Sequence, residues 1–350
     1  MATASSVVNY TDALNVVTLP NIRRDKITDQ VVDTSPFFAL ARGADHLVEE
    51  EGGLFLQETI NVALSPNAGF YTGAGGWKMS TFQGLIALGW DWKLAHDGVV
   101  ITGEELLKND GFSDAIVSLI QARVDVTSLT LPDLFGTYLF RNNPYGTNID
   151  GTTGDPSGFE GLCVQIDDGT VNSTIGQQSR TSYPILKSKV NYNATLTSTM
   201  IAQLQAMWSA ANRGGMNRTK ANFTTEAVYN AFWGYLQTPE RYLLSPERLA
   251  AIGLKTTGGS DLAFNDSVVL IDEKCPTGIQ KPVNAGGSGG MWYGLNTDFL
   301  EMVVHPSRFF SYGEWYKDPF GDQYFLDIYY AGAMKITRPN RQYALWFSGG

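Results

Sequence analysis

Three histidines and two cysteines are the residues whose chemistry would suit a metal or nucleophilic site. They are His46, His96, His305, Cys163 and Cys275. No two histidines lie within five residues of each other and neither cysteine neighbours a histidine, whereas zinc sites usually include a close pair of ligands. The spacing argues against a metal centre, and two distant cysteines favour a reducing compartment over a disulfide framework.

Ser288 lies in a G-x-S-x-G sequence, and Asp298 or Glu301 and then His305 follow in the order of a hydrolase triad. A nucleophile elbow needs a strand before the serine and a helix after it. Residues 282–285 instead include a proline, and a strand-like segment follows the serine. We therefore interpret the segment as a flexible glycine loop.

Carboxylate pairs and aromatic residues give no stronger evidence for catalysis. Asp167-Asp168 and residues 49–51 are acidic clusters, but a glycosidase needs two carboxylates that converge in space, which adjacency does not supply. The eight tryptophans could line a sugar groove, but we favour core and interface anchors. The sequence predicts no enzymatic activity and no cofactor.

Composition places the chain among folded proteins rich in loops. It has 350 residues, 43% of them hydrophobic and 17% charged, with 37 glycines. A disordered chain would need the opposite balance of apolar and charged residues, and the length allows one to three domains. Arg23 is the first basic residue and no apolar segment follows Met1, so we expect no signal peptide and no membrane association.

The net charge of −10 is unevenly distributed. Residues 179–255 carry nine basic and three acidic side chains, in a chain that is otherwise acidic. Ordinary solvated faces would explain this, and so would electrostatic complementarity between copies of the protein. An isoelectric point near 4.8 argues against strong nucleic-acid binding.

The first half of the chain predicts an extended arm, a long hairpin and a long helix. Strands over 53–62 and 84–95 flank the glycine-rich tip 69–76, and such a hairpin would need a neighbouring surface for stability. Thr102 and Glu105 form a capping box. A helix over 112–129 follows, which Pro132 ends or kinks before 134–140 resumes. Residues 142–157 are the strongest linker candidate.

The second half predicts a more compact region. Helices are expected over 197–213, 225–236 and 245–253, and strands over 268–271, 293–304, 325–330 and 343–347.

Several stretches resemble the major capsid proteins of tailed phages, a fold shared with encapsulins and herpesvirus shell floors. They are Thr34-Ser35-Pro36-Phe37-Phe38, Trp90-Asp91-Trp92-Lys93, Lys108-Asn109-Asp110-Gly111, Phe159-Glu160-Gly161-Leu162, Trp292-Tyr293-Gly294-Leu295-Asn296-Thr297, and Asp327-Ile328-Tyr329-Tyr330-Ala331-Gly332 with Arg338-Pro339-Asn340-Arg341. Each is weak alone, but their order and spacing cover about residues 20 to 347. The family's charged helical leader is missing.

The resemblance implies an α+β fold in five parts. They are an N-terminal arm (1–52), an extended hairpin loop (53–95), a peripheral domain with a spine helix (96–155), an axial domain (156–298) and a return segment (299–350) that completes the sheets. The candidates for inter-subunit contact are Phe70, Tyr71, Trp77, Lys78, Arg23 and Arg24.

The resemblance also implies a structural function. Pentamers and hexamers of the chain would form an icosahedral shell around double-stranded DNA that is not bound sequence-specifically. Assembly would take place in the host cytoplasm with a separate scaffolding protein, a portal and a decoration protein as candidate partners, and the product would be the virion. Two alternatives stay open: an encapsulin-type nanocompartment and a secreted carbohydrate-binding or carbohydrate-active protein.

Overall fold

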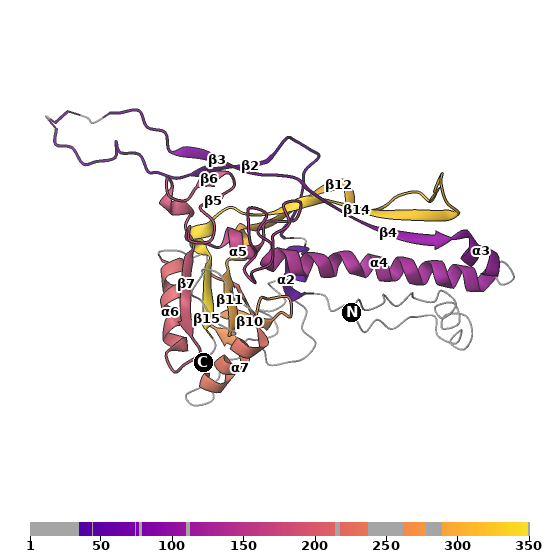
Figure 1. Ribbon diagram of the computed structural model, residues 1–350. Coiled ribbons are helices and arrows are strands. Elements are labelled where there is room, and N and C mark those ends of the chain that lie inside the picture. The colour runs from indigo at the N-terminus through magenta and orange to yellow at the C-terminus, as the bar shows by residue number, and fades with distance from the viewer. Residues whose placement is uncertain are drawn as a thin grey trace. The chain divides into compact units, whose positions relative to one another are not determined.

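The computed structural model describes residues 35–43, 45–73, 75–76, 79–109, 113–213, 218–236, 262–277 and 289–348 (Figure 1). These residues divide into two compact units. Unit 1 takes its described residues from 95–134 and 307–330, and unit 2 takes them from 35–94, 135–306 and 331–348. The five-part division predicted from the resemblance stays a prediction.

The helices are α2 (Pro36–Ala41), α3 (Gly103–Asn109), α4 (Ser113–Arg141), α5 (Leu162–Gln165), α6 (Met200–Ala211) and α7 (Glu226–Leu236), with 3₁₀ turns η1 (Pro184–Leu186), η2 (Thr297–Phe299) and η3 (Pro339–Arg341). The strands are β1 (Leu47–Glu49), β2 (Leu56–Asn61), β3 (Leu85–Trp90), β4 (Lys93–Thr102), β5 (Thr174–Ile175), β6 (Gln178–Ser179), β7 (Lys189–Thr195), β8 (Ala221–Thr224), β9 (Ala263–Phe264), β10 (Ser267–Ile271), β11 (Gly290–Leu295), β12 (Leu300–Tyr312), β13 (Tyr316–Lys317), β14 (Gln323–Ile336) and β15 (Tyr343–Ser348).

A six-stranded sheet of order β7-β15-β11-β8-β10-β9 forms the centre of unit 2. On one face, α6 and α7 bury Leu204 and Phe232 in a cluster with Trp292 and Leu345. Phe140, near the end of α4, lies against the other face. Because both faces are covered, every residue of β11 is buried, as expected for a strand between two helical layers.

Aromatic contacts on that second face also hold α2. The ring of Phe37 lies 5.0 Å from Phe140 and 5.3 Å from Phe223, and Phe140 lies 5.8 Å from Tyr293. Ser35 is the N-cap of this short helix, and its side chain accepts from the backbone N of Phe38.

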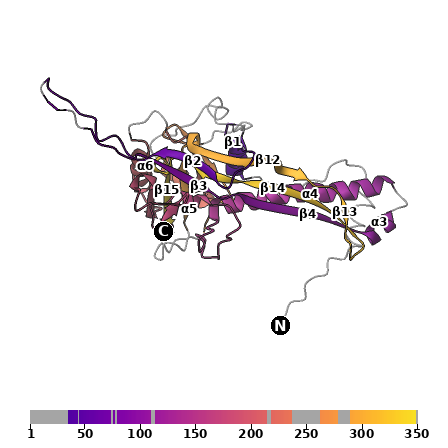
Figure 2. The ribbon, with the colours of Figure 1, turned by 90° about the horizontal axis from the view of Figure 1, so that it is seen from above.

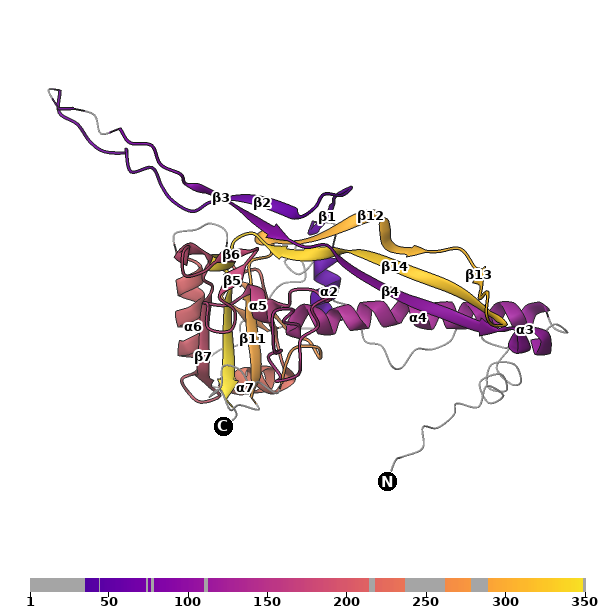
Figure 3. The ribbon, with the colours of Figure 1, turned by 45° about the horizontal axis from the view of Figure 1, so that its top comes forward.

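Unit 1 contains β13, most of β4 and the parts of β12 and β14 that lie within 307–330, which are strands of a second sheet. Its five strands have the order β1-β12-β14-β13, with β4 also paired to β14. Figure 3 shows β4 beside β14, with α4 running along them. A small core of Val99, Ile101 and Leu326, with Val124 of α4 packed against it, joins the helix to these strands.

The predicted capping box at the start of α3 is confirmed. The backbone N of Thr102 donates to Oε2 of Glu105 at 3.0 Å, and the backbone N of Glu105 donates to Oγ1 of Thr102 at 3.4 Å. Each side chain therefore satisfies a backbone N–H that the first helical turn leaves without a partner.

Of the two outcomes predicted for Pro132, an end of the helix is wrong, and a kink stays a prediction. α4 runs from Ser113 to Arg141 with Pro132 inside it. A proline inside a helix costs about 3 kcal/mol, but Phe135, Leu139 and Phe140 are fully buried just beyond it. Burying each contributes about 2 kcal/mol, so packing in unit 2 outweighs the lost hydrogen bond.

Two other local predictions are also wrong. The expected strand 293–304 is divided by η2, because Asn296 caps that turn through the backbone N of Asp298. The segment 142–157, predicted as a linker, instead forms a hydrogen-bonded loop. The side chain of Asn142 donates there to the carbonyls of Asp155 and Phe159. The helix predicted at 245–253 lies outside the described residues.

Candidate assembly surfaces

The predicted hairpin forms as an antiparallel pair. β2 and β3 pair from Leu56↔Trp90 to Asn61↔Leu85, and the chain between them extends well beyond the paired strands (Figure 2). Asn67 joins the two arms of this loop, because its side chain donates to the carbonyl of Ser80 at 2.7 Å and accepts from the backbone N of Ser80 at 2.8 Å.

Large apolar side chains of the hairpin loop face solvent. Phe70 is fully exposed and Tyr71 is 67% exposed, which places both predicted contact residues on the surface. Leu64 and Met79 are also exposed. The other predicted contact residues, Trp77, Lys78, Arg23 and Arg24, lie outside the described residues. Within the predicted extended hairpin (53–95), the name hairpin loop is kept from here on for residues 62–84, the segment between β2 and β3.

The base of the hairpin, in contrast, is firmly packed. Leu56, Leu88 and Trp90 are buried with Val303 and Ala333 of the second sheet. The turn between β5 and β6 lies close beside it: Gly89 donates to the carbonyl of Gly176 at 3.0 Å, and a Cβ on Gly176 would lie 2.8 Å from Leu88 Cβ. Gly176 also has a φ of +50°, so glycine suits this position on both counts.

A buried lysine links the hairpin base to the rest of unit 2. Lys335 on β14 is 3% exposed, and its Nζ lies 3.1 Å from Glu58 Oε2 on β2 and 2.9 Å from Glu301 Oε2 on β12. Burial disfavours the ammonium charge, but the hydrogen bonds to Glu301 and Glu58 outweigh it and raise the pKa of Lys335. Lys335 therefore stays charged at neutral pH and holds both carboxylates.

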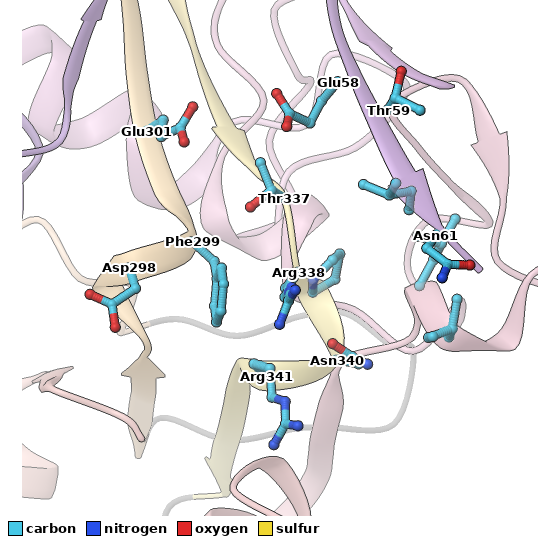
Figure 4. A pocket seen from close by; sticks show the side chains of 14 residues that line it. Glu58, Thr59, Asn61, Asp298, Phe299, Glu301, Thr337, Arg338, Asn340 and Arg341 are labelled. Carbon is cyan, nitrogen blue, oxygen red and sulfur yellow. The ribbon is translucent and has the colours of Figure 1, made fainter. Parts of the chain in front are cut away.

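A cavity of about 440 Å³ opens beside this ion pair, lined by β2, η1 and the segment from Thr337 to Arg341. Figure 4 shows Arg338 beside Phe299 and Arg341 on the same turn. The Arg338 guanidinium lies 4.6 Å from the centre of the Phe299 ring, a cation–π distance. The mixed charges and polar side chains give the cavity no single preference for anions or cations.

A second buried charge network orders the loops around α5. Arg180 is fully buried and lies 3.7 Å from Asp167. It also donates to the carbonyls of Asn172 and Val164 at 2.7 and 2.8 Å, so its desolvated charge is well compensated. Tyr192 donates to Asp167, and burial together with that carboxylate raises the pKa of Tyr192. The first aspartate of the predicted acidic pair is thus structural.

Unit 1 carries its own exposed aromatic residues at the turns between β12 and β14. Phe320 is 98% exposed, and Tyr312, Trp315 and Tyr316 are also exposed. Two of the carboxylates there have partners within unit 1. Asp322 forms an ion pair with Lys317 at 3.1 Å, and Asp327 accepts a hydrogen bond from Tyr316 at 3.0 Å. The sequence did not predict this surface, because aromatic side chains also suit a core.

The residues first considered for catalysis are not assembled into a site among the described positions. Burial raises the pKa of both Cys163 and Cys275 and lowers that of His46. Within the described ranges, no group of three or more His, Cys, Asp or Glu side chains could hold a metal ion. Ser288 lies outside these ranges, and strand β11 follows it.

Three of the eight tryptophans fit the core part of the interpretation as core and interface anchors. Trp90, Trp292 and Trp346 are almost completely buried, and Trp315 is exposed with the aromatic residues of unit 1.

No helix in the described part of the chain is long and apolar enough to cross a membrane.

Comparison with solved structures finds the same arrangement of elements. A subunit from the capsid of cyanophage A-1(L) matches with a TM-score of 0.67 and 14% identity, over 93% of this chain and 96% of that one. The chain has the fold of tailed-phage capsid proteins. The α+β class and the predicted resemblance are therefore confirmed at the level of the fold.

Other structures with this fold include particles of different kinds. The capsid of a native GTA particle matches with a TM-score of 0.55 and 11% identity, over 95% of this chain and 98% of that one. The holo-SrpI encapsulin complex from Synechococcus elongatus matches with a TM-score of 0.56 and 9% identity, over 99% and 95%. No family model matches the sequence, and no curated protein matches it.

Proposed function

We propose that the chain is the major capsid protein of a tailed phage, which assembles as pentamers and hexamers into an icosahedral shell around double-stranded DNA. The observation that supports this most is the likeness of fold over nearly the whole chain to the cyanophage capsid subunit, which matches 93% of it. Fewer than one residue in five is identical, so the proposal rests on architecture.

The hairpin loop gives independent physical support. Leu64, Phe70 and Met79 are exposed on this loop, and a protein that stays monomeric rarely exposes such a series of large apolar side chains. Many copies of one chain can cover these residues by symmetric contact. In the shell, the hairpin loop of each subunit would lie across its neighbour, with Phe70, Tyr71 and Trp77 as anchors.

The charge of the chain suits a container for DNA. A net charge of −10 weakens nonspecific attraction to phosphates, so packaged DNA would slide past the wall instead of adhering to it. We expect a structural role without catalysis, with a separate scaffolding protein, a portal and a decoration protein as further partners in the virion.

An encapsulin-type nanocompartment is the second candidate, because the encapsulin complex matches 99% of this chain. The lower TM-score and identity of that match, 0.56 and 9% against 0.67 and 14%, favour the phage shell. Particles isolated from infected cells decide between them: a phage shell contains DNA and carries a tail vertex, whereas a nanocompartment contains protein cargo.

A further inference from the structure

Three arginines gather at the C-terminal end of α6. Arg341 donates from Nη1 to the carbonyls of Ala211 and Arg213, at 3.3 and 2.7 Å. Arg218 lies with its guanidinium 6.0 Å from the centre of the Trp208 ring, on the last turn of the helix. We call Arg213, Arg218 and Arg341 the arginine cluster.

Asn212 fixes the geometry of this cluster. Its side chain accepts from the backbone N of Thr219 at 2.9 Å and donates to the carbonyl of Trp208, also at 2.9 Å. These bonds join the segment that carries Arg218 to the end of α6. The side chains of Arg213 and Arg218 are exposed, so a built framework presents their charges to solvent.

The cluster lacks the carboxylates that usually accompany arginines on a protein surface. None of its three members forms an ion pair with a described residue. The nearest basic neighbour along the chain, Lys220, is already paired with Asp298. Arg213 and Arg218 also belong to the basic block 179–255. Because the cluster forms no ion pair with a described residue, its charge is available to a partner.

Unit 1 has the opposite charge. Residues 95–134 contain seven acidic and two basic side chains, and residues 307–330 contain four acidic and two basic ones. Arg123 forms an ion pair with Glu105, and Lys317 forms one with Asp322. Among the remaining acidic residues, Glu314 is exposed beside Trp315. Unit 1 therefore keeps an excess of carboxylates.

We propose that the arginine cluster binds the acidic surface of unit 1 in a neighbouring copy of the chain. The inference rests on the proposed function, which brings many copies together. Arginine suits such a contact, because its planar guanidinium pairs with carboxylates and stacks on aromatic rings, and unit 1 offers both. Phosphate of nucleic acid is the competing ligand, which the acidity of the whole chain disfavours.

The first test compares the salt resistance of assembled shells. The double substitution Arg213→Glu and Arg218→Glu should lower the NaCl concentration at which shells dissociate by about twofold, because exposed pairs are screened within about 10 Å at moderate salt. The double substitution Lys187→Glu and Lys189→Glu, in the same basic block but outside the cluster, changes the charge equally; it is the matched control and should have a smaller effect.

The second test keeps the charge and maps the contact. Arg218→Lys introduces an amine that a carbodiimide can join to a carboxylate in direct contact. Mass spectrometry should then find inter-subunit links from position 218 to residues 95–134 or 307–330, which the wild-type chain lacks. Links only to other regions, or none, would overturn the inference.

The outcomes separate this inference from the proposed function. Wild-type shells and double-variant shells with equal salt resistance would contradict the arginine contact alone. A salt effect that is present in DNA-filled shells and absent from empty ones would assign the cluster to phosphate and also overturn the contact. A wild-type chain that never associates would contradict both.

Discussion

Lys335 Nζ lies 3.1 Å from Glu58 Oε2, and this ion pair joins β14 to the first strand of the hairpin. The two residues are 277 positions apart in the chain. Because Lys335 is buried and also binds Glu301, it determines how the base of the hairpin is held against the second sheet.

Replacing Lys335 with Met should lower the free energy of unfolding by about 2 kcal/mol, because two half-buried carboxylates would lose their shared cation. Urea denaturation of the unassembled chain measures this. Lys317→Met, which removes an exposed pair with Asp322, is the control and should leave stability unchanged. Equal losses in the two variants would contradict the role of Lys335.

The contribution of Lys335 should also depend on pH in one direction. Its pKa is raised in the folded chain, so its contribution is full below the unfolded value of about 10.4 and disappears as pH rises through the folded pKa. The stability difference between wild type and Lys335→Met should therefore be constant from about pH 6 to pH 9 and shrink at higher pH. A difference that shrinks already below pH 9 would be inconsistent with this pair.

Glu105 should contribute to stability in the opposite pH range. Burial opposes its charge, but Arg123 and the Thr102 backbone outweigh burial and lower its pKa. A carboxyl with a lowered folded pKa stabilises the fold above its unfolded value of about 4.3 and loses this contribution as pH falls through the folded pKa.

Glu105→Gln should therefore reduce stability by about 1 kcal/mol at pH 7, and the loss should diminish toward pH 3. Glu51→Gln, at an exposed position, is the control. Thermal unfolding at both pH values measures the effect, and a loss that grows on acidification would disprove the assignment.

Asp272 should matter more than Ser35 for the attachment of α2. Asp272 Oδ2 accepts from Ser35 Oγ and, at 3.0 Å, from the backbone N of Phe37. Ser35→Ala removes one capping bond and should reduce stability by about 1 kcal/mol. Asp272→Ala leaves a buried backbone N–H without its acceptor and should reduce stability by about 2 kcal/mol. The reverse order in urea denaturation would contradict this arrangement.

The hairpin loop should affect shells and not isolated subunits. Phe70→Ser should lower the temperature at which shells dissociate, and it should not change the unfolding of the unassembled chain, since Phe70 is fully exposed there. By the same reasoning, Trp77→Ala should weaken shells more than Lys78→Ala. A greater effect of Lys78→Ala would assign a charge or cross-linking role to that lysine.

Covalent cross-links between subunits are not expected. Lys93, one of the two lysines near the hairpin, donates to the carbonyl of Pro156 at 2.9 Å, and Lys78 is the other. Boiled shells on a denaturing gel should give a single monomer band, and a ladder of larger bands would refute this expectation.

Local signals in the sequence were sufficient where one segment determines its own structure. The capping box at Thr102 and Glu105, the apolar face of α6 and the strands on either side of the glycine-rich tip are of this kind. The helix continues past Pro132, which the sequence did not predict, because the packing that offsets this proline comes from α2 and the central sheet, and no local pattern reveals such packing. Lys335, Glu58 and Glu301 were missed for the same reason: each is an ordinary charged residue until the fold brings them together.

The candidate surfaces were predicted only in part. Phe70 and Tyr71 were identified because a long hairpin with a glycine-rich tip must be exposed. The aromatic residues around Phe320 were not identified, because the residue type alone does not distinguish an exposed aromatic side chain from a buried one. The position of the arginine cluster depends on Asn212, which follows α6, and on η3, which carries Arg341. These two parts of the chain meet only after folding.

Electron microscopy of the purified full-length chain, expressed with and without a candidate scaffolding protein, tests the central claim most directly. The account predicts closed, hollow shells of uniform size built from pentamers and hexamers under at least one of the two conditions. A chain that stays a folded monomer under both conditions, at concentrations where its hairpin loop could find a neighbour, would contradict the account.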